Sequence, residues 1–145
     1  MELHTLLVAD YANVAEGGKL NVMGIFRQIF ASTFPARHSQ MYLVTGLSAS
    51  AAEYDSERKL SIKLINEDAT EELVHINRDI KVPKNPSGYR SEMRFIFQLR
   101  DIIFPKDGTY EFSVLVDQDV KGHYSIEVIK DETLASRGLI DEQKK

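Results

Sequence analysis

Residues 92–116 read EMRFIFQLRDIIFPKDGTYEFSVLV, and this stretch decides the fold. Apolar and polar residues alternate on both sides of a Pro-Lys-Asp-Gly turn, which is the pattern of β-strands with one buried face. Proline cannot donate to a strand ladder and glycine adopts turn conformations without strain, so the turn separates two strands. We therefore expect two core strands joined through residues 105–108. Their predicted inward residues are Phe95, Phe97 and Leu99, then Tyr110, Phe112, Val114 and Val116.

Tyr110 follows this turn at the start of the second strand. In β-sandwiches, a tyrosine at this position can bond its hydroxyl to the backbone upstream and close a Greek-key connection. We interpret Tyr110 as such a tyrosine corner, with Pro105 and Gly108 shaping the turn before it.

Similar runs recur along the whole chain of 145 residues, separated by clusters of Gly, Pro, Asn and Asp, as in an all-β fold. Residues 48–58 contain helix-forming residues but are short and lack an apolar stripe, so we expect a loop with at most one helical turn there. Strands without crossover helices are expected to pair antiparallel. The further strands are predicted at residues 6–14, 20–30, 41–47, 59–65, 72–82 and 123–130, with 41–47 apolar on both faces.

The predicted fold is therefore all-β: a single antiparallel β-sandwich of seven to eight strands with an immunoglobulin-like Greek key. The sandwich is expected to span residues 1–131, and residues 132–145 lose the alternation and are expected to form a short, flexible, polar tail.

Three features near the N-terminus are interpreted as structural. Gly17 and Gly18 separate the first two runs and predict a hairpin, because primed turns need positive φ. Gly24 interrupts the second run and predicts a β-bulge. Asp10 lies on a strand otherwise fit for burial, so we expect a buried carboxylate that holds a turn or a salt bridge.

Composition excludes several classes of function. The chain has no cysteine, which excludes disulfides, thiolate zinc sites, iron–sulfur clusters and a cysteine nucleophile. No apolar run is long enough to predict a membrane span. The formal net charge is −4 with scattered Lys and Arg, so nucleic acid is not an expected partner. The acidic start of the chain lacks the basic region of a secretory signal, and we expect a cytoplasmic location.

The residues with catalytic or ligand-binding chemistry form no recognisable site, and we predict no enzyme activity and no catalytic, cofactor or metal residue. Gly17-Gly18-Lys19 leads into a strand, whereas a phosphate loop leads into a helix. An alternative is a calcium site built from Asp117 and Asp119 with Asp55 or Glu57, although such acids are ordinary in turns. The histidines have no metal-binding spacing: His4, His38, His75 and His123.

Three motifs carry a resemblance to a known family. They are Ala9-Asp10-Tyr11-Ala12, then residues 18–26 (GKLNVMGIF), and finally residues 104–112 (FPKDGTYEF). In these motifs the chain resembles a bacterial family of small β-sandwich proteins of unknown function. The resemblance implies a fold similar to immunoglobulin-like sandwiches, and it implies no activity and no ligand residue.

The leading functional prediction is a binding or assembly module that presents loops or an edge strand to another protein, including another copy of itself. Residues 72–82 contain no proline that would block pairing at a sheet edge. The alternative is a small-ligand or carbohydrate-binding domain that uses the loop residues Arg37, His38, Tyr54 and Tyr89.

Overall fold

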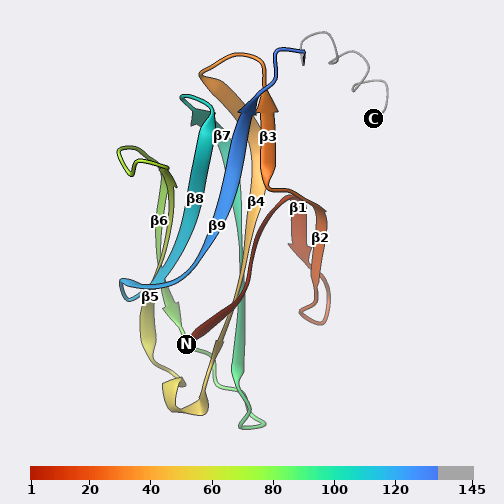
Figure 1. Ribbon diagram of the computed structural model, residues 1–145. Helices are drawn as coiled ribbons and strands as arrows, with labels where there is room; N and C mark the ends of the chain where they lie inside the picture. The colour runs from red at the N-terminus through yellow and green to blue at the C-terminus, as the bar shows by residue number, and fades with distance from the viewer. Residues whose placement is uncertain (134–145) are drawn as a thin grey trace.

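The computed structural model describes residues 1–133, which form nine strands in two sheets packed face to face (Figure 1). The predicted tail falls outside the described residues from position 134 onward. One sheet has four strands in the order β2-β1-β4-β7, and the other has five in the order β3-β9-β8-β5-β6. The strands are β1 (Glu2–Val14), β2 (Leu20–Ile25), β3 (Gln28–Ala31), β4 (Ala36–Ala49), β5 (Glu57–Asn66), β6 (Glu72–Lys81), β7 (Ser91–Phe104), β8 (Gly108–Val116) and β9 (Asp119–Lys130), with a 3-10 turn, η1 (Ala51–Glu53), after β4.

The prediction of an all-β chain is confirmed, but the predicted strand number and the wholly antiparallel pairing are wrong. Residues 20–30 do not form one strand. They divide into β2 and β3, which belong to different sheets. β3 then pairs parallel to β9, from Gln28↔Glu127 to Ala31↔Lys130. Short connections favour antiparallel neighbours, but β3 and β9 are far apart in sequence, so the intervening chain supplies the long connection that a parallel pair needs.

The two strands that decided the fold lie in different sheets, and residues 105–107 carry the chain between them. Both strands send side chains into one continuous core, where Phe97 and Phe112 are buried. Phe95 is partly buried and packs against this core. Full burial of each such side chain contributes about 1.5–3 kcal/mol, so the packing between the sheets stabilises the whole domain.

β1 pairs with two neighbours along different parts of its length: with β4 over its first part and with β2 over its second. Its pairing with β4 ends at Ala9↔Tyr42, whereas its pairing with β2 continues to Val14↔Leu20. The predicted hairpin is confirmed, and its turn has positive φ at both Gly17 and Gly18. In Figure 1 the β1–β2 hairpin lies at the right of the view.

β4 is buried on both faces over residues 41–49, apart from the partly buried Tyr42, as expected of a central strand. The fold contains little helix, and η1 confirms the expected single turn within residues 48–58. Across residues 1–133, no helix combines the length and the apolar character that crossing a membrane requires.

Candidate functional site

The predicted ligand residues do not form one site. Arg37 and His38 lie at the start of β4, whereas Tyr54 follows η1 beyond the other end of that strand. A strand of 14 residues is about 45 Å long, so most of the length of the sheet separates Arg37 and His38 from Tyr54. Tyr89 lies in the loop between β6 and β7.

Arg37 and Tyr54 each have a local contact that holds the side chain in its position. Arg37 Nη1 lies 2.8 Å from Asp101 Oδ1 on the surface. The Tyr54 hydroxyl donates to the backbone carbonyls of Asn85, at 3.3 Å, and of Tyr89, which ties η1 to the loop before β7. The Tyr89 side chain is exposed. These contacts fit a structural role for Tyr54 better than a stacking surface for a sugar.

His38 is the most unusual titratable group among the predicted residues. Its side chain is partly buried, its ring centroid lies 5.7 Å from that of Phe26, and its Nε2 is buried without a hydrogen-bond partner among the described residues. Burial lowers the pKa of His38, although the nearby charge of Asp10 opposes this shift. Burial thus favours the neutral form of the imidazole.

The prediction that Asp10 is buried is wrong, because its side chain is exposed. Asp10 packs across Gly24 of β2, whose φ is +72°, and a Cβ at Gly24 would lie 2.5 Å from Asp10 Oδ2. Gly24 thus provides both the positive φ and the space for the Asp10 side chain. The sequence pattern misplaced Asp10 because β1 leaves β4 at this point, so alternation no longer implies burial.

Tyr110 has the geometry of a tyrosine corner. Its hydroxyl donates to the Lys106 carbonyl at 2.6 Å, and its ring meets that of Phe104 edge-on with centroids 4.9 Å apart. The side chain is 1% exposed, and burial raises its pKa. Pro105 and Gly108 bound the connection that this bond closes.

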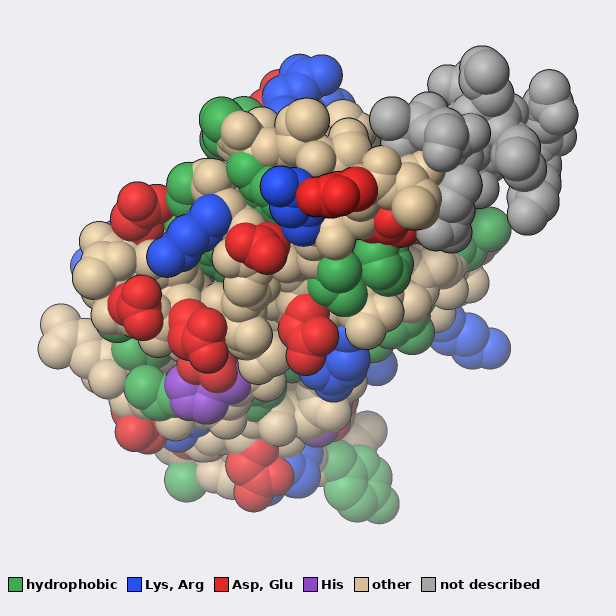
Figure 2. Space-filling view, turned by 45° about the horizontal axis from the view of Figure 1, so that its top comes forward, with side chains coloured by type: hydrophobic (Ala, Val, Ile, Leu, Met, Phe, Trp, Pro, Cys, Tyr) green, Lys and Arg blue, Asp and Glu red, His purple; other side chains and the backbone are tan. Residues whose placement is uncertain are grey.

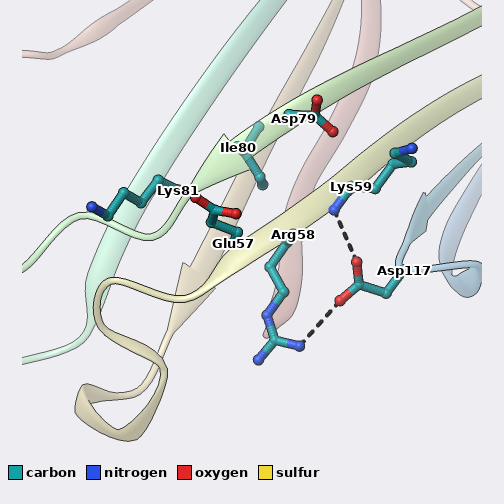
Figure 3. Close-up of a pocket in the computed structure, with 7 residues that line it drawn as sticks. All are labelled: Glu57, Arg58, Lys59, Asp79, Ile80, Lys81 and Asp117. Carbon is teal, nitrogen blue, oxygen red and sulfur yellow. Dashed lines mark hydrogen bonds and ion pairs between the residues drawn. The ribbon is translucent and has the colours of Figure 1, made fainter.

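A polar hollow of about 490 Å³ lies where the start of β5, the end of β6 and the β8–β9 turn meet (Figure 3). Asp117 points toward β5: its Oδ1 accepts from the Lys59 amide at 2.9 Å and its Oδ2 lies 3.1 Å from Arg58 Nη1. These two contacts lower the pKa of Asp117. The residues that line the hollow are Glu57, Arg58, Lys59, Asp79, Ile80, Lys81 and Asp117.

The carboxylates of the alternative calcium site already have cationic neighbours. Asp117 pairs with Arg58, and Asp119 Oδ2 lies 2.9 Å from Lys121 Nζ. Asp117 and Gln118 both have positive φ, as a two-residue hairpin turn requires. Within residues 1–133, no three His, Asp or Glu side chains gather as metal ligands would. The hollow is thus a cross-strand ion-pair region.

A different region carries exposed apolar side chains on adjacent strands. On the face of β2-β1-β4-β7 that points away from the core, Tyr11 is 44% exposed, Met23 65% and Ile25 59%. The strand register places Tyr11 opposite Met23, and Ala9 between Ile25 and Tyr42. The rings of Tyr11 and Tyr42 meet edge-on with centroids 5.3 Å apart. We call this surface the outer face.

The outer face has a small hydrophobic layer of its own. Val44 points away from the core, yet it is fully buried, because it lies between Leu7 of β1 and Ile96 of β7. Ala9 is fully buried in the same way, between Ile25 and Tyr42. The layer remains open to water at its β2 side. The other large exposed hydrophobic residues lie at strand ends, in a loop or on the second sheet: Val14, Phe30, Tyr89, Ile103 and Val120.

Polar side chains border this layer on the β7 side. The amides of Gln40 and Gln98 lie 3.0 Å apart, and Arg94 and Arg100 stand on the same face of β7. Neither arginine forms an ion pair with a residue that the structure describes, whereas Arg37, Arg58 and Arg90 each do. At the far end of the face, the Glu92 carboxylate is bound by His4 at 2.7 Å.

Sequence reasoning missed the outer face, although part of its signal was present. Leu7 and Tyr11 share one side of the first strand by alternation, and Met23 and Ile25 share one side of the second. Alternation assigns residues to a face of their own strand, but the register between strands brings them together.

The fold places the chain among two-sheet all-β domains. The chain belongs to a family of unknown function, DUF6941, whose family model matches residues 4–129. The expectation of a family of unknown function is thereby confirmed over most of the chain. No curated protein sequence matches the chain.

The solved structures that are similar to the chain include two with different coverage. The first is the Pseudomonas fluorescens alkylpurine DNA glycosylase AlkC bound to DNA containing an abasic site analog, with a TM-score of 0.51 and 14% identity over 88% of this chain and 30% of that chain. The second is a β-glucuronidase from glycoside hydrolase family 2, with a TM-score of 0.37 and 12% identity over 60% of this chain and 9% of that chain. The first likeness concerns the fold alone, and the second carries no argument.

Proposed function

We propose that the chain is a non-enzymatic protein-binding module that docks a partner on its outer face. The observation that carries this proposal is the contiguous exposed set of Tyr11, Met23 and Ile25, next to the partly buried Tyr42, on a sheet whose opposite face is already a packed core. Contiguous exposed apolar surface commonly marks an interaction site, whereas single exposed apolar residues do not.

The residue types of the outer face match those of protein interfaces. Tyrosine, methionine and arginine are enriched in interfaces, and lysine and acidic residues are depleted. Completing the burial of Tyr11, Met23 and Ile25 would contribute about 3–5 kcal/mol, which is the scale of an interface hot spot.

Pairing at the β6 edge is a weaker basis for assembly. β6 does lie at the edge of its sheet, but the Arg78 guanidinium lies 4.9 Å from the centre of the Phe97 ring on the facing sheet. A charged residue directed inward from an edge strand opposes edge-to-edge association, because pairing would hinder its access to water.

We infer that the connectivity is immunoglobulin-like. The order β1-β4-β7 facing β9-β8-β5-β6 supports this inference, because it parallels strands A-B-E facing G-F-C-C′. Tyr110 at the start of β8 supports it further, since tyrosine corners lie near the start of strand F.

We propose no nucleic-acid function, although the similar glycosylase was solved with DNA. The formal net charge is −4, and acidic and basic side chains are interspersed over the face seen in Figure 2. Binding to a phosphate backbone depends on clustered Lys and Arg, and two arginines on the outer face supply too few phosphate contacts.

The test compares a double variant, Met23→Glu with Ile25→Glu, with the control Val120→Glu on the other sheet. Val120 is 50% exposed, so all the substitutions add carboxylates at exposed apolar positions. The wild type and the control are expected to co-purify one stoichiometric protein partner from native cells, or to self-associate in analytical ultracentrifugation. The double variant is expected to lose that association and to keep its circular dichroism spectrum. Equal association by the double variant, or a wild type that is monomeric and recovers no partner, would contradict the proposal.

A further inference from the structure

We propose that the partner is a different protein whose docking segment is acidic as well as apolar. Its apolar side chains would cover Met23 and Ile25, and its carboxylates would lie against Arg94 and Arg100. This inference rests on the proposed function, because it assigns the chemistry of the segment that occupies the same outer face.

The two arginines are placed at opposite ends of one side of the hydrophobic layer. The register pairs Arg94 with Gly46 and Arg100 with Gln40. Tyr42, which pairs with Gln98, therefore lies between the two arginines along the strand direction. Six residues along β7 span about 20 Å. The face reaches β2 at the row of Gln98, Tyr42, Ala9 and Ile25, where three strand spacings span about 14 Å. The face therefore has the dimensions to receive one short segment, with a cation near each end of its long side.

Neither arginine has a carboxylate partner among residues 1–133, although Arg100 Nε and Nη2 lie 3.3 and 3.1 Å from the Gln98 amide. Arg94 and Arg100 are exposed and form no ion pair within residues 1–133, and the Glu92 carboxylate on this face is held by His4. A guanidinium presents a fixed array of donors that matches the two oxygens of a carboxylate. The two acids on this face, Glu2 and Glu92, lie at its Arg94 end, where they pair with Arg90 and His4.

The same charges disfavour a second copy as the occupant. Symmetric dimers pair a patch with itself, so the arginine-bearing outer faces of two copies would be brought together. Like charges opposed across an interface lower affinity, whereas an acidic segment gains from both arginines. A foreign acidic and apolar segment thus fits this face better than another copy of the chain.

The experiment selects binders from a phage-displayed library of random 12-residue peptides. Wild-type protein is the bait. A counter-selection on the variant with Met23→Glu and Ile25→Glu removes peptides that bind outside the outer face. The selected peptides are expected to be enriched in Trp, Phe or Leu together with Asp and Glu. Synthetic copies of them are expected to bind more weakly as salt rises, because the arginine contacts are exposed.

A second double variant, Arg94→Glu with Arg100→Glu, is expected to lower the binding affinity for these peptides by about tenfold or more. The control Lys84→Glu, in the exposed loop between β6 and β7, is expected to leave affinity unchanged. Peptides that require Met23 and Ile25 but are neutral or basic, or that ignore the arginine variant, would overturn the inference and leave the proposed function standing. Failure to select any peptide that depends on Met23 and Ile25 would contradict both.

Discussion

Replacing Tyr110 with phenylalanine tests how strongly one hydrogen bond holds the connection between the two sheets. The Tyr110 hydroxyl donates to the Lys106 carbonyl at 2.6 Å, and the ring is buried against Phe104. The substitution Tyr110→Phe keeps the ring and removes the hydroxyl. The substitution Tyr110→Ala removes both, so the pair separates the hydrogen bond from the packing.

The expected losses of stability differ in size. An intramolecular hydrogen bond contributes about 0.5–1.5 kcal/mol, and leaving its partner unpaired adds to the loss, so Tyr110→Phe is expected to cost about 1.5 kcal/mol. With an m-value of about 2 kcal/mol/M in urea, the unfolding midpoint would fall by about 0.8 M. Truncation of the 1% exposed ring in Tyr110→Ala is expected to cost about 3–5 kcal/mol, because it also leaves a cavity.

Urea denaturation followed by far-ultraviolet circular dichroism measures these midpoints. Tyr89→Phe is the matched control, since the Tyr89 side chain is 75% exposed in the loop between β6 and β7. The control is expected to shift the midpoint by less than about 0.3 M, as for a surface change. A Tyr110→Phe midpoint equal to that of the wild type would refute the role of the hydrogen bond. A midpoint equal to that of Tyr110→Ala would refute the separation of the two contributions.

Gly24→Ala is expected to destabilise the fold by about 1–2 kcal/mol, because φ is +72° and the new Cβ meets the Asp10 side chain. Thermal melts should show part of that loss recovered in an Asp10→Ala background, and no recovery would argue against the contact. Burial lowers the pKa of His38, so its neutral form contributes stability above the ordinary histidine value of about 6.5, and this stability is lost as pH falls below it. Urea midpoints from pH 7 to 5 should therefore decline less in His38→Gln than in the wild type; equal declines would count against this. The Lys59 amide and Arg58 lower the pKa of Asp117, so its charged form stabilises the fold above pH 4 and that contribution is lost on further acidification. Asp117→Asn should flatten the fall in stability between pH 5 and 3, and an unchanged fall would exclude Asp117 as its source.

Several features of the fold could be predicted from the sequence because they depend on local pattern. Alternation along residues 92–104 and 108–116 identified β7 and β8, since a strand with one buried face repeats every two residues. The turn between them positions Tyr110, and its hydrogen bond closes within four residues of sequence. Contacts between residues this close in sequence can be predicted from the sequence.

Features that depend on distant parts of the chain could not be predicted. The division of residues 20–30 between two sheets requires β9 as a parallel partner for β3. The exposure of Asp10 follows from the separation of β1 from β4, which the pattern of β1 alone does not indicate. The outer face requires the register of four strands, so residues that the sequence placed in loops, such as Arg37 and Tyr54, were more prominent candidates, although Arg37 lies in β4.

Site-specific photo-crosslinking in native cells tests the docking role of the outer face most directly. A photoreactive phenylalanine analogue replaces Met23 in one strain and Val120, on the opposite sheet, in another; both positions are at least half exposed. Position 23 is predicted to crosslink to one protein in high yield, and position 120 is predicted not to crosslink to it. No crosslink from position 23, or the same products from both positions, would contradict the assignment.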